Sequence, residues 1–181
     1  MTSPEEAGPG ASALRELVMP VVVVTAGDGE ETACATSTTS YVSLQPPVLC
    51  VALAPESRTA RMVVRTGKFG VSLLTAGQAG LAQRAGRPAA GPDKLAAVGI
   101  SQERPPAEAG EAAPPGVEGA AAVLWCEVTD VLPVGDHQVI FGQVSAVRGQ
   151  ADETALLLRH HRHYLSTGQA VTPPAADGYP I

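Results

Sequence analysis

Basic residues are scarce in this chain of 181 residues. Lysine and arginine together number 12, against 18 acidic residues, and the formal net charge is −6. A surface that binds a nucleic acid duplex needs clustered lysine and arginine side chains. The basic residues are scattered along the sequence and supply no such cluster, so we exclude nucleic acid as a partner.

Long apolar runs are also missing. Runs such as residues 21–24 and 48–54 are far shorter than the roughly 20 residues that span a bilayer. The first residues, MTSPEEAGPG, are acidic and rich in proline and glycine. They lack the basic and apolar regions of a secretory signal. We therefore expect no membrane insertion, no secretion and a cytoplasmic location.

Cysteine is rare, and its spacing is uninformative for metal binding. Cys34, Cys50 and Cys126 are odd in number and far apart, with no C-x-x-C pair. Neither a disulfide framework nor a zinc site is indicated. Because their neighbours are apolar or β-favouring, we expect buried thiols that act as small hydrophobic side chains in a reducing compartment.

Several catalytic motifs are absent as well. No G-x-G-x-x-G follows a predicted strand, so a Rossmann dinucleotide site is not indicated. The G-x-S-x-G elbow of serine hydrolases and the H-E-x-x-H helix of zinc proteases are also missing. Hydrolase chemistry therefore has no support in the sequence.

The sequence does contain a series of β-branched and apolar segments separated by turn residues. We expect one domain at residues 11–168, with a disordered leader at 1–10 and a loose tail at 169–181. The pattern predicts strands at residues 20–26, 32–35, 48–53, 69–74, 120–132 and 138–147. Short helices are predicted at residues 11–19, 58–66, 78–85 and 154–164. Residues 86–119 are expected to form a long surface excursion. The predicted fold is a mainly β barrel or sandwich with short α insertions.

Four segments together resemble the flavin reductase-like family over about residues 14–165. They are VVVVTA at 21–26, CATSTTSYVSLQPPVLCVAL at 34–53, the Ser57-Arg58-Thr59 element, and the pair EGAAAVLWCEV at 118–128 and GDHQVIFGQV at 135–144. The resemblance implies an FMN-binding split β-barrel that reduces FMN or FAD with NAD(P)H. It also implies a homodimer and a monooxygenase partner that receives the reduced flavin.

The start of the helix predicted at residues 58–66 is a candidate phosphate site. Ser57 and Thr59 offer hydroxyl donors, and the first-turn N–H groups are unpaired and favour an anion. Arg58 adds charge, and Lys94 is a further candidate cofactor-binding residue. The alternative is that Ser57 only caps the helix.

Five consecutive hydroxyl side chains precede a Pro-Pro turn: Thr36, Ser37, Thr38, Thr39 and Ser40. Hydroxyls compete for nearby backbone groups, so we expect a loop between two buried strands rather than a regular strand. A rigidly held, donor-rich loop suits the polar groups of a flavin. The alternative is an ordinary solvated loop.

His137 is the candidate catalytic residue. It follows Asp136 in the turn before a strand. The resemblance places this histidine where a nicotinamide approaches, and the alternative is a surface histidine. On an extended chain the two side chains point to opposite faces, so we expect Asp136 not to orient the ring.

The predicted C-terminal helix carries further candidates. The resemblance implies that Arg162 and Tyr164 contact NAD(P)H. His160, His161 and His163 have no acidic or thiol partner nearby in sequence, so we expect no metal there.

These observations predict an NAD(P)H:flavin oxidoreductase. The sequence leaves open FMN or FAD, and NADH or NADPH. Two alternatives remain: a split-barrel flavoprotein with another reaction, and a small-ligand-binding protein that is not a flavin reductase.

Overall fold

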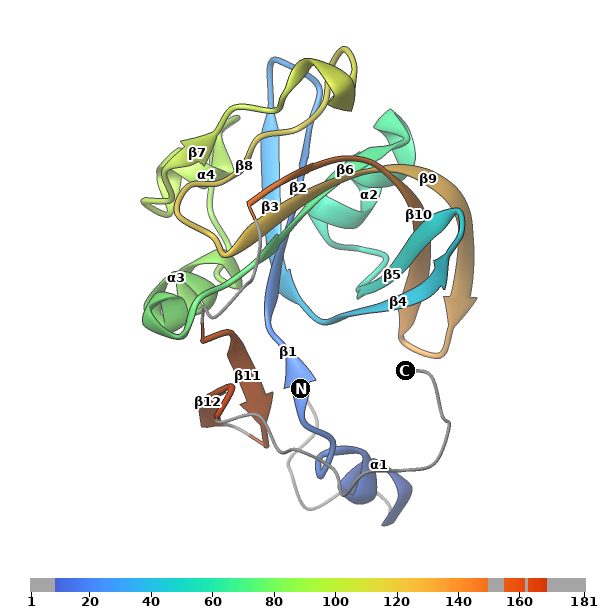
Figure 1. Ribbon diagram of the computed structural model, residues 1–181, viewed down its shortest axis with the longest axis vertical. Coiled ribbons are helices and arrows are strands. Elements are labelled where there is room, and N and C mark those ends of the chain that lie inside the picture. The colour runs from blue at the N-terminus through green and yellow to red at the C-terminus, as the bar shows by residue number, and fades with distance from the viewer. Residues whose placement is uncertain (1–8, 150–154, 162, 169–181) are drawn as a thin grey trace, which may run out of the picture.

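A computed structural model describes residues 9–149, 155–161 and 163–168 (Figure 1). The principal strands are β2 (Val22–Gly27), β3 (Thr32–Ser37), β4 (Thr39–Leu44), β5 (Pro47–Leu53), β6 (Lys68–Leu73), β9 (Ala122–Val134) and β10 (His137–Arg148). The short strands are β1 (Met19–Pro20), β7 (Gln102–Glu103), β8 (Gly116–Val117), β11 (Leu157–His160) and β12 (His163–Ser166). The helices are α1 (Pro9–Leu14), α2 (Arg58–Thr66), α3 (Ala79–Ala85) and α4 (Lys94–Ala97), with 3₁₀ turns η2 (Ala76–Gln78) and η3 (Ala107–Ala109).

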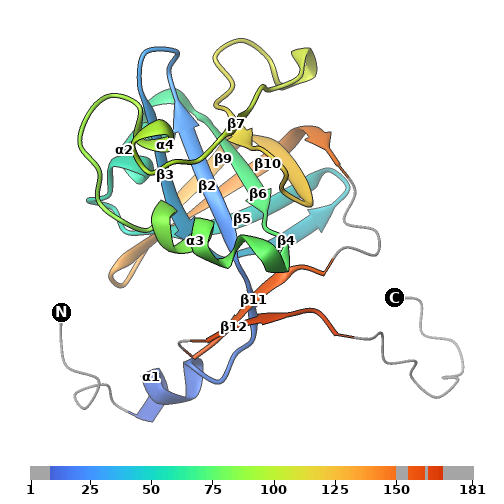
Figure 2. The same cartoon turned by 90° about the vertical axis from the view of Figure 1, so that its left-hand side faces the viewer.

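The principal strands form one antiparallel sheet in the order β3-β2-β6-β9-β10-β5-β4. Strands β3 and β4 are the two edges of this sheet, yet only Thr38 separates them in sequence. The hydroxyl of Ser37, at the end of β3, donates to Ala52 O on β5 at 2.7 Å. The sheet therefore curls back on itself, as the views in Figures 1 and 2 show. The mainly β architecture and each of the six predicted strands are confirmed, with boundaries shifted by a few residues.

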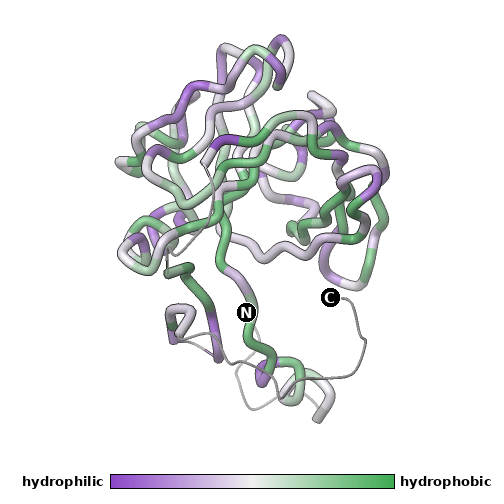
Figure 3. The backbone as a smooth tube through the Cα atoms, viewed as in Figure 1, coloured by the Kyte–Doolittle hydropathy of each residue, from purple (hydrophilic) through white to green (hydrophobic). Residues whose placement is uncertain are grey.

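Strand β2 explains why the core is continuous, because it is buried along its whole length. Val22 and Val24 pack inside the barrel with Phe69 and Ile140. The opposite face, with Val23, packs against α3, the excursion and the small sheet formed by β1, β11 and β12. In Figure 3 hydrophobic stretches follow the central strands, and hydrophilic ones gather in the loops.

Helix α2 covers one end of the barrel, as the sequence predicts. Its first turn is capped by Ser57, whose Oγ accepts from Ala60 N at 3.1 Å, and it ends at Gly67 with a left-handed φ of 69°. Ala60 and Val63 are buried in the barrel core. The cap at one end and the glycine at the other fix the direction in which the helix start points.

The helix predicted at 154–164 is wrong. The described residues there form the β11–β12 hairpin, which pairs with β1 through Met19 and Arg159 (Figure 2). Leu157 is buried against the outer face of β2, so pairing with a distant segment decides the structure of a locally ambiguous leucine run. The entry helix predicted at 11–19 is also shorter, since it ends at Leu14 and Met19 begins β1.

The hydroxyl run is not a loop, which corrects a second expectation. Its residues lie in β3 and β4, with Thr38 at the corner between them. The hydroxyls of Ser37 and Thr39 donate to carbonyls of the neighbouring strand β5, at Ala52 O and Cys50 O. The two hydroxyls thus form their hydrogen bonds with β5, and the backbone of β4 still pairs with β5.

The excursion at residues 86–119 carries α4, β7, η3 and β8. Its apolar residues Leu95 and Ile100 are buried against the outer face of β2, which anchors the excursion.

The three cysteines are free thiols. Cys34 and Cys126 are buried, and burial raises the pKa of Cys126 to about 12. None of the helices in the described part of the chain is long and apolar enough to cross a membrane. The predicted leader and tail fall mostly or wholly outside the described residues.

Candidate functional site

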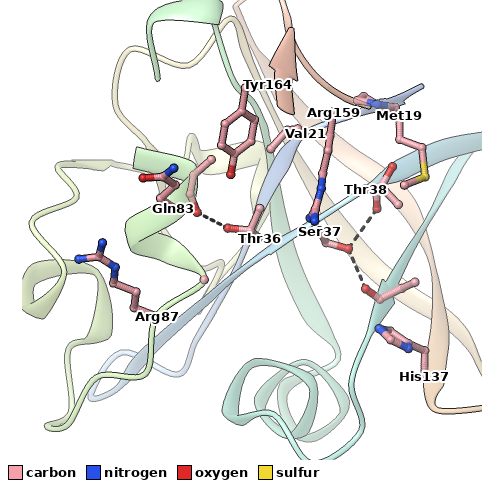
Figure 4. Close-up of a pocket in the computed structure, with 14 residues that line it drawn as sticks. Met19, Val21, Thr36, Ser37, Thr38, Gln83, Arg87, His137, Arg159 and Tyr164 are labelled. Carbon is pink, nitrogen blue, oxygen red and sulfur yellow. Dashed lines mark hydrogen bonds between the residues drawn. The ribbon is translucent and has the colours of Figure 1, made fainter. Parts of the chain in front are cut away.

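The larger of two adjoining pockets lies between the end of β3, helix α3 and the small sheet, and has a volume of about 480 Å³. Figure 4 shows Tyr164 and Arg159 entering it from the small sheet, toward Thr36 and Ser37. Its lining is Met19, Pro20, Val21, Thr36, Ser37, Thr38, Ala52, Ala82, Gln83, Gly86, Arg87, His137, Arg159 and Tyr164. The volume is in the range of small-molecule and cofactor sites.

The smaller pocket, of about 380 Å³, contains the start of α2. It shares Thr36, Gly86 and Arg87 with the larger pocket, so the two form one elongated groove. Its other lining residues are Cys34, Ala35, Ser57, Arg58, Thr59, Ala85, Pro88, Ala89 and Lys94. The groove therefore has an α2 end, at the smaller pocket, and a hairpin end, at the larger one.

Three predicted residues lie at the α2 end because they begin the helix. Ser57 caps the first turn, and Thr59 is buried in the groove wall. The guanidinium of Arg58 donates to Pro92 O at 2.6 Å and to Gly91 O, and lies 3.7 Å from a Glu31 carboxylate oxygen. Arg58 thus ties the helix start to the excursion while it lines the pocket.

Lys94 also lines the α2 end of the groove. Its Nζ donates to Cys34 O at 2.6 Å and to Ala85 O at 3.1 Å. An ammonium group has three N–H donors, so one remains for a ligand. Burial raises the pKa of the neighbouring Cys34 thiol, an effect that Lys94 partly offsets, and the thiol stays neutral at ordinary pH.

The hydroxyl run divides between the groove and the sheet. Thr36 lines both pockets and donates to Ala82 O, while Ser37 and Thr38 line the larger pocket. Thr39 and Ser40 line neither pocket: Thr39 donates to Cys50 O at 2.9 Å, and Ser40 is exposed with its hydroxyl on Tyr41 O. The corner at Thr38 turns the rest of the run away from the groove.

His137 lies at the hairpin end of the groove, at the start of β10. Its Nδ1 is 2.8 Å from Oδ1 of Asp136, so the expectation that Asp136 does not contact the ring is wrong. The preceding Gly135 has a φ of 59°, which places Asp136 in a tight turn, where strand alternation does not apply. The hydrogen bond to His137 holds the pKa of Asp136 below its ordinary value.

Two arginines of the groove were missed in the sequence. Arg87 follows the end of α3 and lines both pockets, and Arg159 lies on β11 in a segment predicted as helix. Neither belongs to a motif, so only the folded structure identifies them. Tyr164 lines the larger pocket as a member of β12. Arg162, the other candidate in this segment, lies outside the described residues.

The charge of the groove is distinctive in an acidic chain. Arg58, Arg87, Lys94 and Arg159 line it, and no carboxylate does among the residues that the structure describes. Cationic side chains, hydroxyl donors and a helix start suit an elongated ligand that carries phosphate. Gly86 lies at the junction, where a Cβ would stand 3.5 Å from Thr36 Oγ1, so a larger side chain would narrow the passage. The donor set and the shape fit a flavin nucleotide.

Fold and groove together define a mainly β barrel protein with an extended groove lined by cationic side chains. The flavin reductase like domain family matches residues 14–168. This chain therefore belongs to the flavin reductase-like family.

Relatives agree with this assignment. The chain is 32% identical, over 75% of its length and 80% of the relative's, to the reductase component of 4-hydroxyphenylacetate 3-monooxygenase from Thermus thermophilus. It is 31% identical to an NADH-dependent FMN reductase from Streptomyces nodosus, over 81% of this chain and 77% of that one. Among solved structures, an NADH:FAD oxidoreductase from Streptomyces globisporus superposes with a TM-score of 0.79 at 22% identity, covering 93% of this chain and 98% of the other. This last likeness confirms the fold.

Proposed function

We propose that this protein uses NAD(P)H to reduce FMN or FAD and supplies the reduced flavin to a partner monooxygenase. The observation that carries the proposal is the groove lined by four cationic side chains and no described carboxylate. Relatives named as flavin reductases and as the reductase component of a monooxygenase support it.

The flavin phosphate is assigned to the α2 end. There Ser57 and Thr59, at the start of α2, and Lys94 line one pocket, and a helix start favours an anion. The hydroxyls of Thr36, Ser37 and Thr38 line the path toward the hairpin end and suit the ribityl and ring polar groups. When bound, the flavin supplies the acceptor for a hydride from the nicotinamide. The chain's own contribution is to hold the two ligands at reacting distance.

NAD(P)H is assigned to the hairpin end. Tyr164 offers an aromatic surface, while Arg159 and Arg87 offer charge for phosphates. His137 lies at the mouth of the groove. Asp136 contacts its Nδ1 and orients the ring, so Nε2 is the nitrogen that can face a ligand. In this position it contacts the nicotinamide carboxamide or moves a proton. Arg162 stays a prediction for the same end.

The test is a titration of the purified chain with FMN and with FAD, followed by anaerobic addition of NADH or NADPH. We expect saturable flavin binding and bleaching of the flavin absorbance by the reduced nicotinamide. Flavin binding without bleaching would favour a flavoprotein with another reaction. No flavin binding would favour a protein that binds a different small ligand.

A homodimer is part of the proposal. Exposed apolar side chains gather on β4 and at the end of the β9–β10 hairpin: Tyr41, Val42, Leu44, Leu132 and Val134. Strand β4 is an edge of the sheet, and a second copy of the chain packed on it would cover Tyr41, Val42 and Leu44. Light scattering at micromolar concentration should return a dimer mass, and Leu44→Glu should shift it toward the monomer. A wild-type monomer mass would count against the dimer. The cytoplasmic location stays a prediction.

A further inference from the structure

Three possible metal ligands meet outside the groove. Glu16, in the segment between α1 and β1, reaches the β11–β12 hairpin, where its Oε2 lies 3.6 Å from Nε2 of His160 and 3.2 Å from Nε2 of His161. The candidate ligand atoms of the three residues all lie within 4.8 Å of one another. The acidic partner that is absent near these histidines in sequence is thus supplied by a residue far away along the chain.

The spacing suits a tetrahedral ion. Zinc bonds of about 2.0–2.2 Å to nitrogen and oxygen place tetrahedral ligand atoms about 3.4 Å apart. The two separations from Glu16, 3.2 and 3.6 Å, fall on either side of that value. The side chains of Glu16, His160 and His161 are 66%, 35% and 41% exposed, so water can reach a remaining coordination position.

The backbone at His161 is the independent sign that this arrangement is specific. The first residue after β11 lies in the left-handed region, which favours glycine or asparagine. His161 occupies it with a φ of 52°. Its ring then lies edge-on to that of His160, with centroids 4.4 Å apart. A histidine in this unfavourable conformation places a second imidazole beside the first.

We propose that Glu16, His160 and His161 bind a divalent transition-metal ion of the Zn²⁺ class. Two imidazoles and one carboxylate are ligands for zinc and its neighbours, whereas Mg²⁺ and Ca²⁺ prefer oxygen alone. Arg159 lines the larger pocket of the groove, and its Nε donates to His161 O at 3.1 Å, which holds the turn beside the cluster. The cluster itself lines neither pocket of the groove, so its role is structural.

The bound ion would join the N-terminal segment to the hairpin. That hairpin carries Arg159 and Tyr164 into the groove. Its base is held by pairing with β1 and by the buried Leu157, whose N–H donates to Leu74 O, whereas Glu16 contacts the turn end. A ligand that binds the folded state stabilises it by mass action. Metal binding would therefore fix the wall of the hairpin end, independently of whether the groove reduces flavin.

The experiment is calorimetric titration of the full-length, tag-free chain with Zn²⁺, alongside thermal unfolding with and without the ion. We expect one Zn²⁺ per chain and a rise in Tm that Mg²⁺ does not produce. Glu16→Gln and His161→Gly should each weaken Zn²⁺ binding at least about tenfold. His161→Gly should not lower the metal-free Tm, since glycine relieves the positive φ. His163→Gln, an exposed histidine of the same hairpin, is the matched control and should bind like wild type.

Two results would overturn the proposal. One is a wild-type chain without saturable Zn²⁺ binding. The other is a set of equal affinities in wild type, Glu16→Gln and His161→Gly, which would place the ion elsewhere.

Discussion

Two pockets of nearly equal volume lie in different parts of this molecule, and their chemistry is opposite. The larger groove pocket, of about 480 Å³, carries Arg87 and Arg159 and no described carboxylate. A second pocket, of about 470 Å³, lies beside the β2–β3 turn and the excursion. We call it the acidic pocket, because its lining includes Glu30, Glu31, Asp93 and Glu103, with Arg104 as its cationic side chain.

The volume of a pocket therefore does not identify the proposed flavin site, but the charge of its lining does. A phosphate-bearing ligand is repelled by clustered carboxylates and attracted by cations, and these interactions strengthen in partly enclosed pockets. The acidic carboxylates are also engaged structurally: Asp93 caps α4 and accepts from Thr32 Oγ1 at 2.6 Å.

Reversing the charge at the junction of the groove should have the largest effect. Arg87 is exposed and lines both pockets of the groove. Arg87→Glu should weaken binding of flavin or NAD(P)H by about 3 kcal/mol, or more than about a hundredfold, with the fold intact. Arg104→Glu in the acidic pocket is the matched control and should leave both affinities unchanged. Fluorescence titration measures the two affinities. Equal losses of affinity in Arg87→Glu and Arg104→Glu would show that the charge of the groove is not what selects the ligand.

Removing the hydroxyls at the start of α2 tests the phosphate assignment. The double variant Ser57→Ala, Thr59→Ala should weaken FMN binding by about 1–3 kcal/mol, because each hydroxyl is assigned a charge-assisted bond. Thr75→Ala, which removes a hydroxyl at the start of η2 outside the groove, is the control. Unchanged FMN affinity in a folded double variant would remove the phosphate from this end.

A variant of His137 tests the NAD(P)H end of the groove separately from the flavin end. His137→Ala should leave flavin affinity nearly unchanged and lower kcat/KM for NAD(P)H about ten- to a hundredfold. His163→Ala, an exposed histidine outside the groove, is the control. Stopped-flow bleaching at saturating flavin gives the rates, and equal rates in variant and parent would return His137 to the class of surface residues.

The smallest effect concerns a carboxylate of the acidic pocket. Burial works to raise the pKa of Asp93, but hydrogen bonds from Thr32, Ala96 and Gln102 outweigh it, and the pKa lies below its ordinary value of 3.8. A lowered carboxyl pKa stabilises the fold above the unfolded value and loses that contribution as the pH falls through the folded value. Asp93→Asn should therefore cost about 0.5–1 kcal/mol near neutral pH, and less in acid. Denaturant unfolding at several pH values checks this. A deficit that persists unchanged well below the ordinary carboxyl pKa would refute it.

Much of the barrel was predictable because its strands and α2 carry strong local signals. The run 21–24 is buried on both faces, and α2 spans the predicted residues 58–66 with Ser57 as its cap. The β11–β12 hairpin was not predictable, because three consecutive leucines suit a helix or a strand equally. Its pairing with Met19 and Pro20 across the molecule makes the choice.

The candidate site divides in the same way. Ser57, Thr59 and Thr36 belong to local patterns, and the structure brings all three into one pocket. Arg87 and Arg159 depend on how α3 and the hairpin pack, which no local pattern encodes. The contact of His137 with Asp136 depends on a turn geometry that an extended-strand argument overlooks.

The central claim is that the cationic groove, and not the acidic pocket, is the flavin site. A crystal structure of the chain with FMN or FAD tests it most directly. We expect flavin density along the groove, with a phosphate within hydrogen-bond distance of Ser57 and Thr59. Flavin density in the acidic pocket or elsewhere on the surface, with the groove empty, would contradict it.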